Sequence, residues 1–129
     1  MDAIKKIIEI KGLSKENPHC KIKNPPYMDL VIEILPDNLV SVAHYSEQNG
    51  DLMADPEMIF RIVQSKKFNT KKMDFDQVEE WVPVYYKNDF MGKEIDLTDK
   101  PDIKLKGDFH KLWNKNLKDQ GFVKESKKK

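Results

Sequence analysis

The residues best suited to chemistry lie close together in one short stretch, Ala43 to Met58, which reads AHYSEQNGDLMADPEM. Carboxylates bind hard cations such as Mg²⁺, and a histidine combined with carboxylates also suits Zn²⁺, Mn²⁺ or iron. The same residue types can form an ion-paired hairpin or a surface that binds another macromolecule. The stretch therefore has three interpretations, namely a structural hairpin, a binding surface or a metal site, and the candidate side chains are His44, Glu47, Asp51, Asp55 and Glu57.

The Asn49-Gly50 pair divides this stretch into two predicted strands. Asn-Gly between strand-like segments is the strongest short-range hairpin signal, because a type I′ turn needs positive φ at both central residues. A two-residue turn here would place His44 opposite Asp55 on the neighbouring strand. In that position the carboxylate could orient or charge the imidazole.

Pro56 decides which way the remaining acids point. Proline cannot donate a hydrogen bond to a neighbouring strand, so it belongs at a sheet edge or at a bulge. Without a bulge, Glu57 shares a face with Asp55, and the metal interpretation rests on His44, Asp55 and Glu57. Glu47 lies on the opposite face of its strand from His44, because successive side chains alternate.

The elements that position these residues can be predicted from periodicity and turn signals. Apolar spacing predicts a helix over 2–11 ended by Gly12, and a second helix that begins after an N-cap at Asp108 and ends before Gly121. The proline-containing segment 13–26 is predicted to be a connector, and the polar segment 64–79 a long loop or short helix. Alternation predicts strands at 28–35, 39–47, 53–63 and 80–87, and weakly at 91–97.

These elements predict an α+β fold, an antiparallel β-meander of four to five strands flanked by an N-terminal and a C-terminal helix packed on one face. The chain of 129 residues has a single-domain length. We expect one α+β domain over 1–123 and a lysine-rich disordered tail over 124–129.

Composition excludes several classes of protein. No apolar run reaches the roughly 20 residues needed to span a bilayer, so no membrane partner is expected. The single cysteine, Cys20, excludes an internal disulfide and fits a reducing cytoplasm. The sequence has none of the Walker A, GxGxxG, HExxH or GxSxG patterns, and no cofactor is expected. A nuclease-like site would need a lysine two residues after Glu57, where Ile59 stands.

Charge is distributed unevenly although the net charge is only +1. Residues 28–62 contain many acids and one base, Arg61, whereas residues 100–129 are rich in lysine. The lysine-rich C-terminal helix is therefore a candidate for nucleic-acid binding. The aromatic strand WVPVYYKNDF could stack on bases, but Trp81, Tyr85 and Tyr86 are also typical of a half-buried strand.

Three segments, SVAHYSEQNGDLMADPEMIF, WVPVYYKNDFMG and LWNKNLKDQGF, resemble an uncharacterised family of short proteins. That family is carried by bacterial phages and integrative or conjugative elements, and the resemblance spans roughly Leu30 to Phe122. It implies a bacterial accessory protein of a mobile element and carries over no catalytic residue. We therefore expect a non-enzymatic module that binds a macromolecule, most simply a protein, through the acidic hairpin. The alternatives are a small metal-dependent enzyme and a DNA-binding protein.

Overall fold

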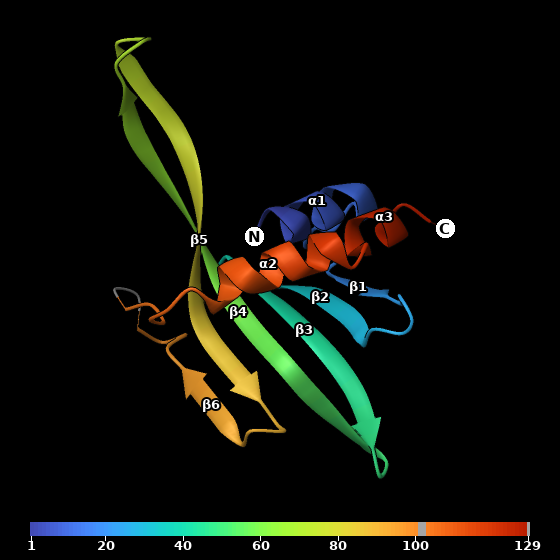
Figure 1. The fold of residues 1–129 in the computed structure, drawn as a ribbon. Coiled ribbons are helices and arrows are strands. Elements are labelled where there is room, and N and C mark those ends of the chain that lie inside the picture. Colours follow the sequence, from blue (N-terminus) through green and yellow to red (C-terminus); the bar gives the residue numbers. More distant parts are fainter. Residues whose placement is uncertain (101–102, 129) are drawn as a thin grey trace.

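A computed structural model describes residues 1–100 and 103–128 of the chain (Figure 1). Within these residues the chain forms three helices and a six-stranded sheet. The helices are α1 (Asp2–Lys11), α2 (Phe109–Asp119) and α3 (Phe122–Ser126). The strands are β1 (His19–Ile22), β2 (Asp29–Leu35), β3 (Leu39–Gln48), β4 (Asp51–Asn69), β5 (Asp74–Asn88) and β6 (Lys93–Asp96).

The sheet is an antiparallel meander in which every strand pairs with its neighbours in sequence, in the order β1-β2-β3-β4-β5-β6. The α+β class and the antiparallel arrangement are therefore confirmed. The predicted number of strands, four to five, is wrong, because part of the predicted connector forms an edge strand. Residues His19 to Ile22 pair with Glu33 to Leu30 of β2. An edge strand of four residues is too short to show a clear alternation of polar and apolar side chains.

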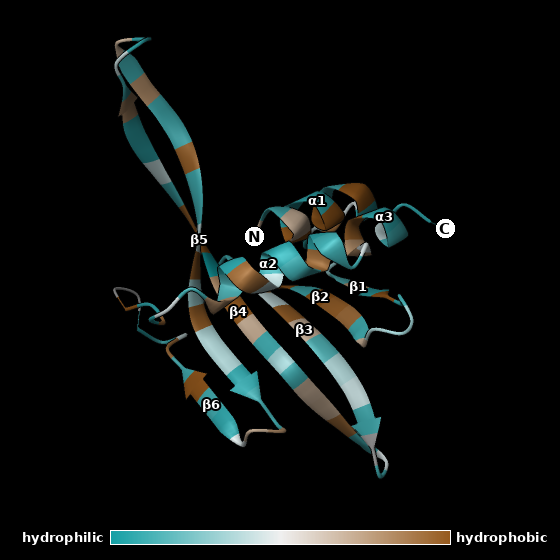
Figure 2. Ribbon diagram, viewed as in Figure 1, coloured by the Kyte–Doolittle hydropathy of each residue, from teal (hydrophilic) through white to brown (hydrophobic). Residues whose placement is uncertain are grey.

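The core lies between the helices and one face of the sheet. On that face the fully buried side chains include Leu30 and Ile32 of β2, Val42 of β3 and Phe60 of β4. The helices add further fully buried side chains, namely Ile4, Ile7, Leu117 and Phe122. Figure 2 shows apolar segments on these strands and on the helices above them. Burial of this apolar surface is the main favourable contribution to folding.

Helices α1 and α2 form where the spacing predicts them. Gly12, with φ of 63°, ends α1 in the left-handed conformation that glycine adopts without strain. The two ends of the chain meet in this layer, because the backbone N–H of Ala3 donates to Asn114 Oδ1 of α2 at 2.9 Å. Helices α1, α2 and α3 therefore form one layer, although about a hundred residues separate α1 from α2 in sequence.

The structure differs from the prediction at the start of the expected disordered tail, residues 124–129. Residues 124–126 belong to α3, which starts at the fully buried Phe122. The Ser126 hydroxyl donates to the carbonyl oxygen of Val123, and Lys128 Nζ lies 2.9 Å from Glu125 Oε1. One anchored aromatic ring and these local contacts keep the helical turn in place. Lys129, the last residue of the predicted tail, lies outside the described residues.

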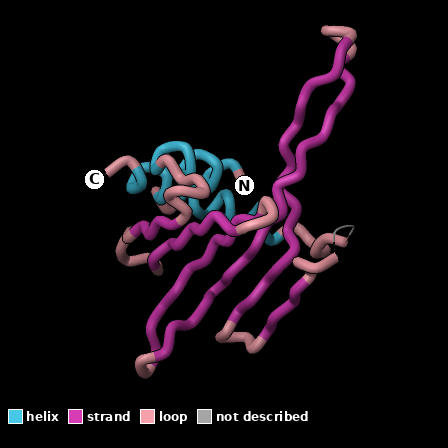
Figure 3. The backbone as a smooth tube through the Cα atoms, turned by 180° about the vertical axis from the view of Figure 1, so that it is seen from behind, coloured by secondary structure: helices cyan, strands magenta, loops and turns pink. Residues whose placement is uncertain are grey.

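The prediction of a loop or short helix over 64–79 is wrong. Strand β4 continues to Asn69 and β5 begins at Asp74, so the two strands remain paired from Ser65 with Val78 to Asn69 with Asp74. This two-stranded ribbon, residues 64–79, is called the arm below. Figures 1 and 3 show that it projects well beyond the rest of the sheet. Its strands lack a buried face, so period-two burial could not reveal them.

Candidate binding surfaces

The hairpin between β3 and β4 has the turn that the sequence predicts. Asn49 and Gly50 have φ of 50° and 84°, and Gln48 pairs with Asp51. The predicted register continues as far as Tyr45 opposite Ala54 and then shifts, because Ala43 pairs with Glu57. The two residues Asp55 and Pro56 thus lie opposite the single residue His44. This bulge, at the proline where an irregularity was predicted, places Glu57 on the other face of the sheet.

His44 lies beneath the helices rather than on a surface. Its side chain is 7% exposed, and its ring centroid lies 5.6 Å from that of Trp113 and 5.3 Å from that of Phe122. Its Nδ1 atom is 3.2 Å from the carbonyl oxygen of Met28. Burial lowers the pKa of His44, while backbone hydrogen bonds at Asp29 and Met28 and the charge of Asp55 act in the opposite direction. The imidazole is therefore a hydrogen-bonded core group, neutral near pH 7.

The other acids of the hairpin occupy separate environments. Glu47 and Asp51 are exposed near the turn. Asp55 accepts a hydrogen bond from Asn88 Nδ2 at 2.8 Å, at the end of β5. Within residues 1–100 and 103–128, no group of three His, Cys, Asp or Glu side chains is arranged to hold a metal ion. The structure thus places His44 and Asp55 on one face but separates both from Glu57.

Glu57 belongs instead to a polar cluster on the opposite face of the sheet. Ser41 Oγ donates to Glu57 Oε2 at 3.2 Å. Burial, and then the charge of Glu57 and a hydrogen bond to it, raise the pKa of Tyr45 to about 12. Burial and the nearby carboxylates of Glu57 and Glu94 also raise the pKa of Tyr85. Both tyrosines therefore remain protonated near neutral pH and can donate hydrogen bonds.

The arm carries apolar side chains at its far end. Phe68, Met73 and Phe75 are 52%, 74% and 60% exposed, and the two phenylalanine rings lie edge to face with centroids 5.3 Å apart. The turn is held by Asn69, whose Oδ1 atom accepts hydrogen bonds from the backbone N–H groups of Lys71 and Lys72. Periodicity in the sequence did not indicate this surface. Asn69, between two phenylalanines, was the available signal, because asparagine side chains often stabilise turns.

The aromatic residues at the base of the arm face the helices. The ring centroid of Trp81 lies 5.8 Å from that of Phe60, and Trp81 Nε1 donates to Glu79 Oε1 at 2.9 Å. Tyr86 has its ring centroid 5.8 Å from that of Phe109 in α2. These two rings pack within the fold, as the half-buried-strand interpretation predicts, rather than forming an open stacking surface.

The lysines of α2 are partly matched by acids. Lys111 Nζ lies 3.6 Å from Asp108 Oδ1, and Lys118 Nζ lies 3.8 Å from Asp2 Oδ2 of α1. Lys115 is exposed on the same helix. Surface ion pairs of this kind contribute little stability, but they reduce the positive charge available to a phosphate backbone.

Comparisons with known proteins identify a family but no characterised relative. A family model described as a domain of unknown function (DUF6908) matches residues 2–123. No match was found among curated proteins or among solved structures. In the described part of the chain, the helices are too short and too polar to cross a membrane.

Proposed function

The chain belongs to the DUF6908 family, and because this family has no assigned activity, we propose a function from the surface of the molecule. The proposed function is that of a non-enzymatic module that binds another protein through the far end of the arm. We define this arm tip by Phe68, Met73 and Phe75, together with Lys66 and Lys71. The proposal includes a cytoplasmic setting in bacteria, as an accessory protein of a phage or another mobile element.

The observation that carries the proposal is the exposure of three large apolar side chains on an isolated ribbon. Each of Phe68, Met73 and Phe75 is more than half exposed, and Figure 1 shows the far end of the ribbon well separated from the helical layer. Contiguous exposed apolar side chains mark interaction surfaces, and a ribbon of two strands gains little stability on its own. A partner that covers the tip would bury this apolar surface and stabilise the ribbon.

Charge at the arm tip indicates the chemistry of the partner. Lys72 pairs with Asp76 at 2.9 Å, and Lys67 with Glu80 at 3.9 Å. Within the described residues, Lys66 and Lys71 have no acidic partner within ion-pair distance, so the tip combines apolar side chains with positive charge. The complementary surface is an apolar groove bordered by carboxylates on another protein.

Site-specific photocrosslinking tests this proposal. A photoreactive phenylalanine analogue replaces Phe75 at the arm tip or, as a control, Tyr27, an aromatic residue of the body that is 43% exposed. After irradiation of bacterial cells that make the full chain, we expect one defined protein adduct from position 75 and not from position 27. The double substitution Lys66→Glu and Lys71→Glu is expected to abolish that adduct, whereas the distant pair Lys15→Glu and Lys115→Glu leaves it unchanged.

Three outcomes would reject the proposal. These are identical adducts from positions 75 and 27, an adduct that survives charge reversal at Lys66 and Lys71, and an adduct that nuclease treatment removes. The last outcome would instead favour nucleic-acid binding. The metal-dependent alternative has weaker support, because it requires His44, Asp55 and Glu57 in one site and the bulge separates them. Binding through the acidic hairpin also has weaker support, because only Glu47 and Asp51 among its candidate residues are exposed and His44 is buried.

A further inference from the structure

A cavity beside the beginning of α2 has no part in the proposed protein contact. It is partly open to solvent and has a volume of about 590 Å³ between β5, β6, residues 103–107 and the beginning of α2. Ligand sites in proteins commonly enclose about 300–1,000 Å³ and have mostly apolar walls. Here the walls are mainly apolar, and the side chains that matter most are Met58, Tyr86, Ile95, Leu97, Leu105 and Phe109.

The cavity is built around an irregularity in β5. Ile59 of β4 pairs with Tyr85, whereas the next residue, Phe60, pairs with Pro83, so Val84 is left over. The carbonyl oxygens of Val84 and Pro83 accept hydrogen bonds from the backbone N–H groups of Leu97 and Leu105, each at 2.8 Å. The lining residues Leu97 and Leu105 are thus both attached to β5.

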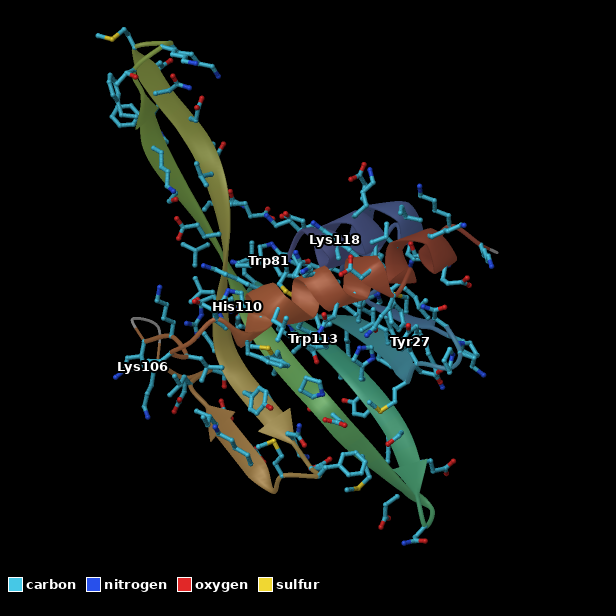
Figure 4. The ribbon with its side chains drawn as sticks, viewed as in Figure 1. Tyr27, Trp81, Lys106, His110, Trp113 and Lys118 are labelled. Carbon is cyan, nitrogen blue, oxygen red and sulfur yellow. The ribbon has the colours of Figure 1, made fainter. Side chains whose placement is uncertain are left out.

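Positive charge surrounds the apolar walls. The lining includes Lys93, Lys104, Lys106 and His110, and no Asp or Glu occurs among its described residues. Lys93 Nζ lies 5.8 Å from the centre of the Tyr86 ring. Figure 4 shows Lys106 and His110 near the beginning of α2.

The electrostatics of this rim favour an anion. None of the three lysines has an acidic partner within ion-pair distance in the described part of the chain. Burial lowers the pKa of His110, and the positive charges of the N-terminal amino group, Lys111 and Lys104 lower it further, against the influence of Asp108. A bound negative charge would relieve the repulsion among these groups.

We propose that this cavity binds a small amphipathic anion, an apolar chain or ring system that ends in a carboxylate. The apolar body would lie against Ile95, Leu105 and Phe109, and the carboxylate would lie at the lysine rim. An uncharged molecule of the same shape would bury the same apolar surface and lose the electrostatic attraction. A polar anion without an apolar body would lose the hydrophobic contribution.

Calorimetric titration of the full chain with decanoate, below its micellar concentration, tests the proposal, with decanol as the uncharged control. We expect decanoate to bind at least about tenfold more tightly than decanol, a difference that a few charge contacts can supply. The triple substitution Lys93→Ala, Lys104→Ala and Lys106→Ala should remove this difference and leave the affinity for decanol unchanged. The control triple Lys15→Ala, Lys115→Ala and Lys127→Ala, on exposed lysines elsewhere, should leave the preference for decanoate unchanged.

A second pair of variants tests the cavity itself. Ile95→Trp is expected to fill the cavity and abolish binding of both ligands. Val63→Trp changes a strand residue with the same exposed fraction, 37%, at the base of the arm and should leave binding unchanged. The proposal is overturned if decanoate does not bind, if decanol binds equally well, or if the Lys93/Lys104/Lys106 triple retains full preference for decanoate. If Ile95→Trp does not fold, the lysine variants still decide the question.

Discussion

His44 shows how a residue suited to catalysis can serve as part of the core. Its ring lies between β3 and the aromatic residues Trp113 and Phe122, and its Nδ1 atom lies within hydrogen-bond distance of the carbonyl oxygen of Met28. A buried polar group costs little free energy when it has such a partner, but a buried charge costs much more. His44 is therefore expected to make stability depend on pH.

The sign of this dependence follows from the direction of the shift. The pKa of His44 in the folded protein is lower than its ordinary value of 6.5, so the unfolded chain binds a proton more readily. We expect the free energy of unfolding to fall as the pH drops below about 6.5. His44→Gln, which does not titrate there, should reduce the difference between urea unfolding at pH 7.5 and at pH 5.5.

His110 supplies the control for this experiment. Burial lowers its pKa too, so it also makes the free energy of unfolding fall as the pH drops. His110→Gln should remove a smaller part of the pH dependence, since its side chain is less buried than that of His44. An unchanged dependence on pH in His44→Gln would contradict the assignment of His44 as a neutral core residue.

Local sequence was sufficient to predict one part of the β3–β4 hairpin but not the other. Asn49-Gly50 was sufficient to predict the turn and the pairing next to it, because turn geometry depends on adjacent residues. The register shift was not predictable in detail, because the polar groups at the bulge form hydrogen bonds with residues of a distant segment. Asp89 Oδ2 accepts from the backbone N–H of Ala54 at 2.7 Å, and Asn88 donates to Asp55. Those partners lie at the end of β5 and directly after it, about 35 residues away.

At the scale of elements, the arm shows that two strands can pair without burying a face. Strand β4 has 19 residues, whereas strands typically have about five or six, and its second half is paired only with β5. Cross-strand pairs such as Phe68 with Phe75 support it instead of a core. The sequence predicted the inner halves of β4 and β5 because their alternation reflects burial. It did not predict their outer halves.

Removing the arm should leave the rest of the fold intact. Ser65 and Val78 are partners in the sheet, so an Asn-Gly turn can replace residues 66–77 between them. None of the replaced residues is buried, and we expect the free energy of unfolding to change by less than about 1 kcal/mol. Ile32→Ala, at a fully buried position, should cost about 2–5 kcal/mol in the same denaturation assay. A comparable loss on removal of the arm would mean that the ribbon is part of the core.

At the scale of the whole molecule, the helical layer joins the two ends of the chain over a sheet made of the middle. Ala3 bonds to Asn114, and Lys11 Nζ donates to the carbonyl oxygen of Lys128 at 3.2 Å. The two longer helices were predictable because each has its own apolar spacing and a glycine beyond its end. Their meeting was not evident from local patterns, because it depends on side chains more than a hundred positions apart.

The meander and the helical layer also differ in the order in which they can form. Pairing of consecutive strands closes only short loops, whereas docking of α2 on α1 closes a loop of more than a hundred residues, and long loops cost more entropy. We therefore expect the helical layer to dock after the transition state for folding. Leu117→Ala should then mainly accelerate unfolding, and Ile32→Ala should mainly slow refolding, although both positions are fully buried.

Stopped-flow refolding and unfolding of these two variants would reveal that order, and the reverse pattern of rates would contradict it. If the order holds, the sheet and its arm exist before the helices close over them. The arm tip would then be available to a partner while the ends of the chain are still undocked, and binding could begin before folding is complete.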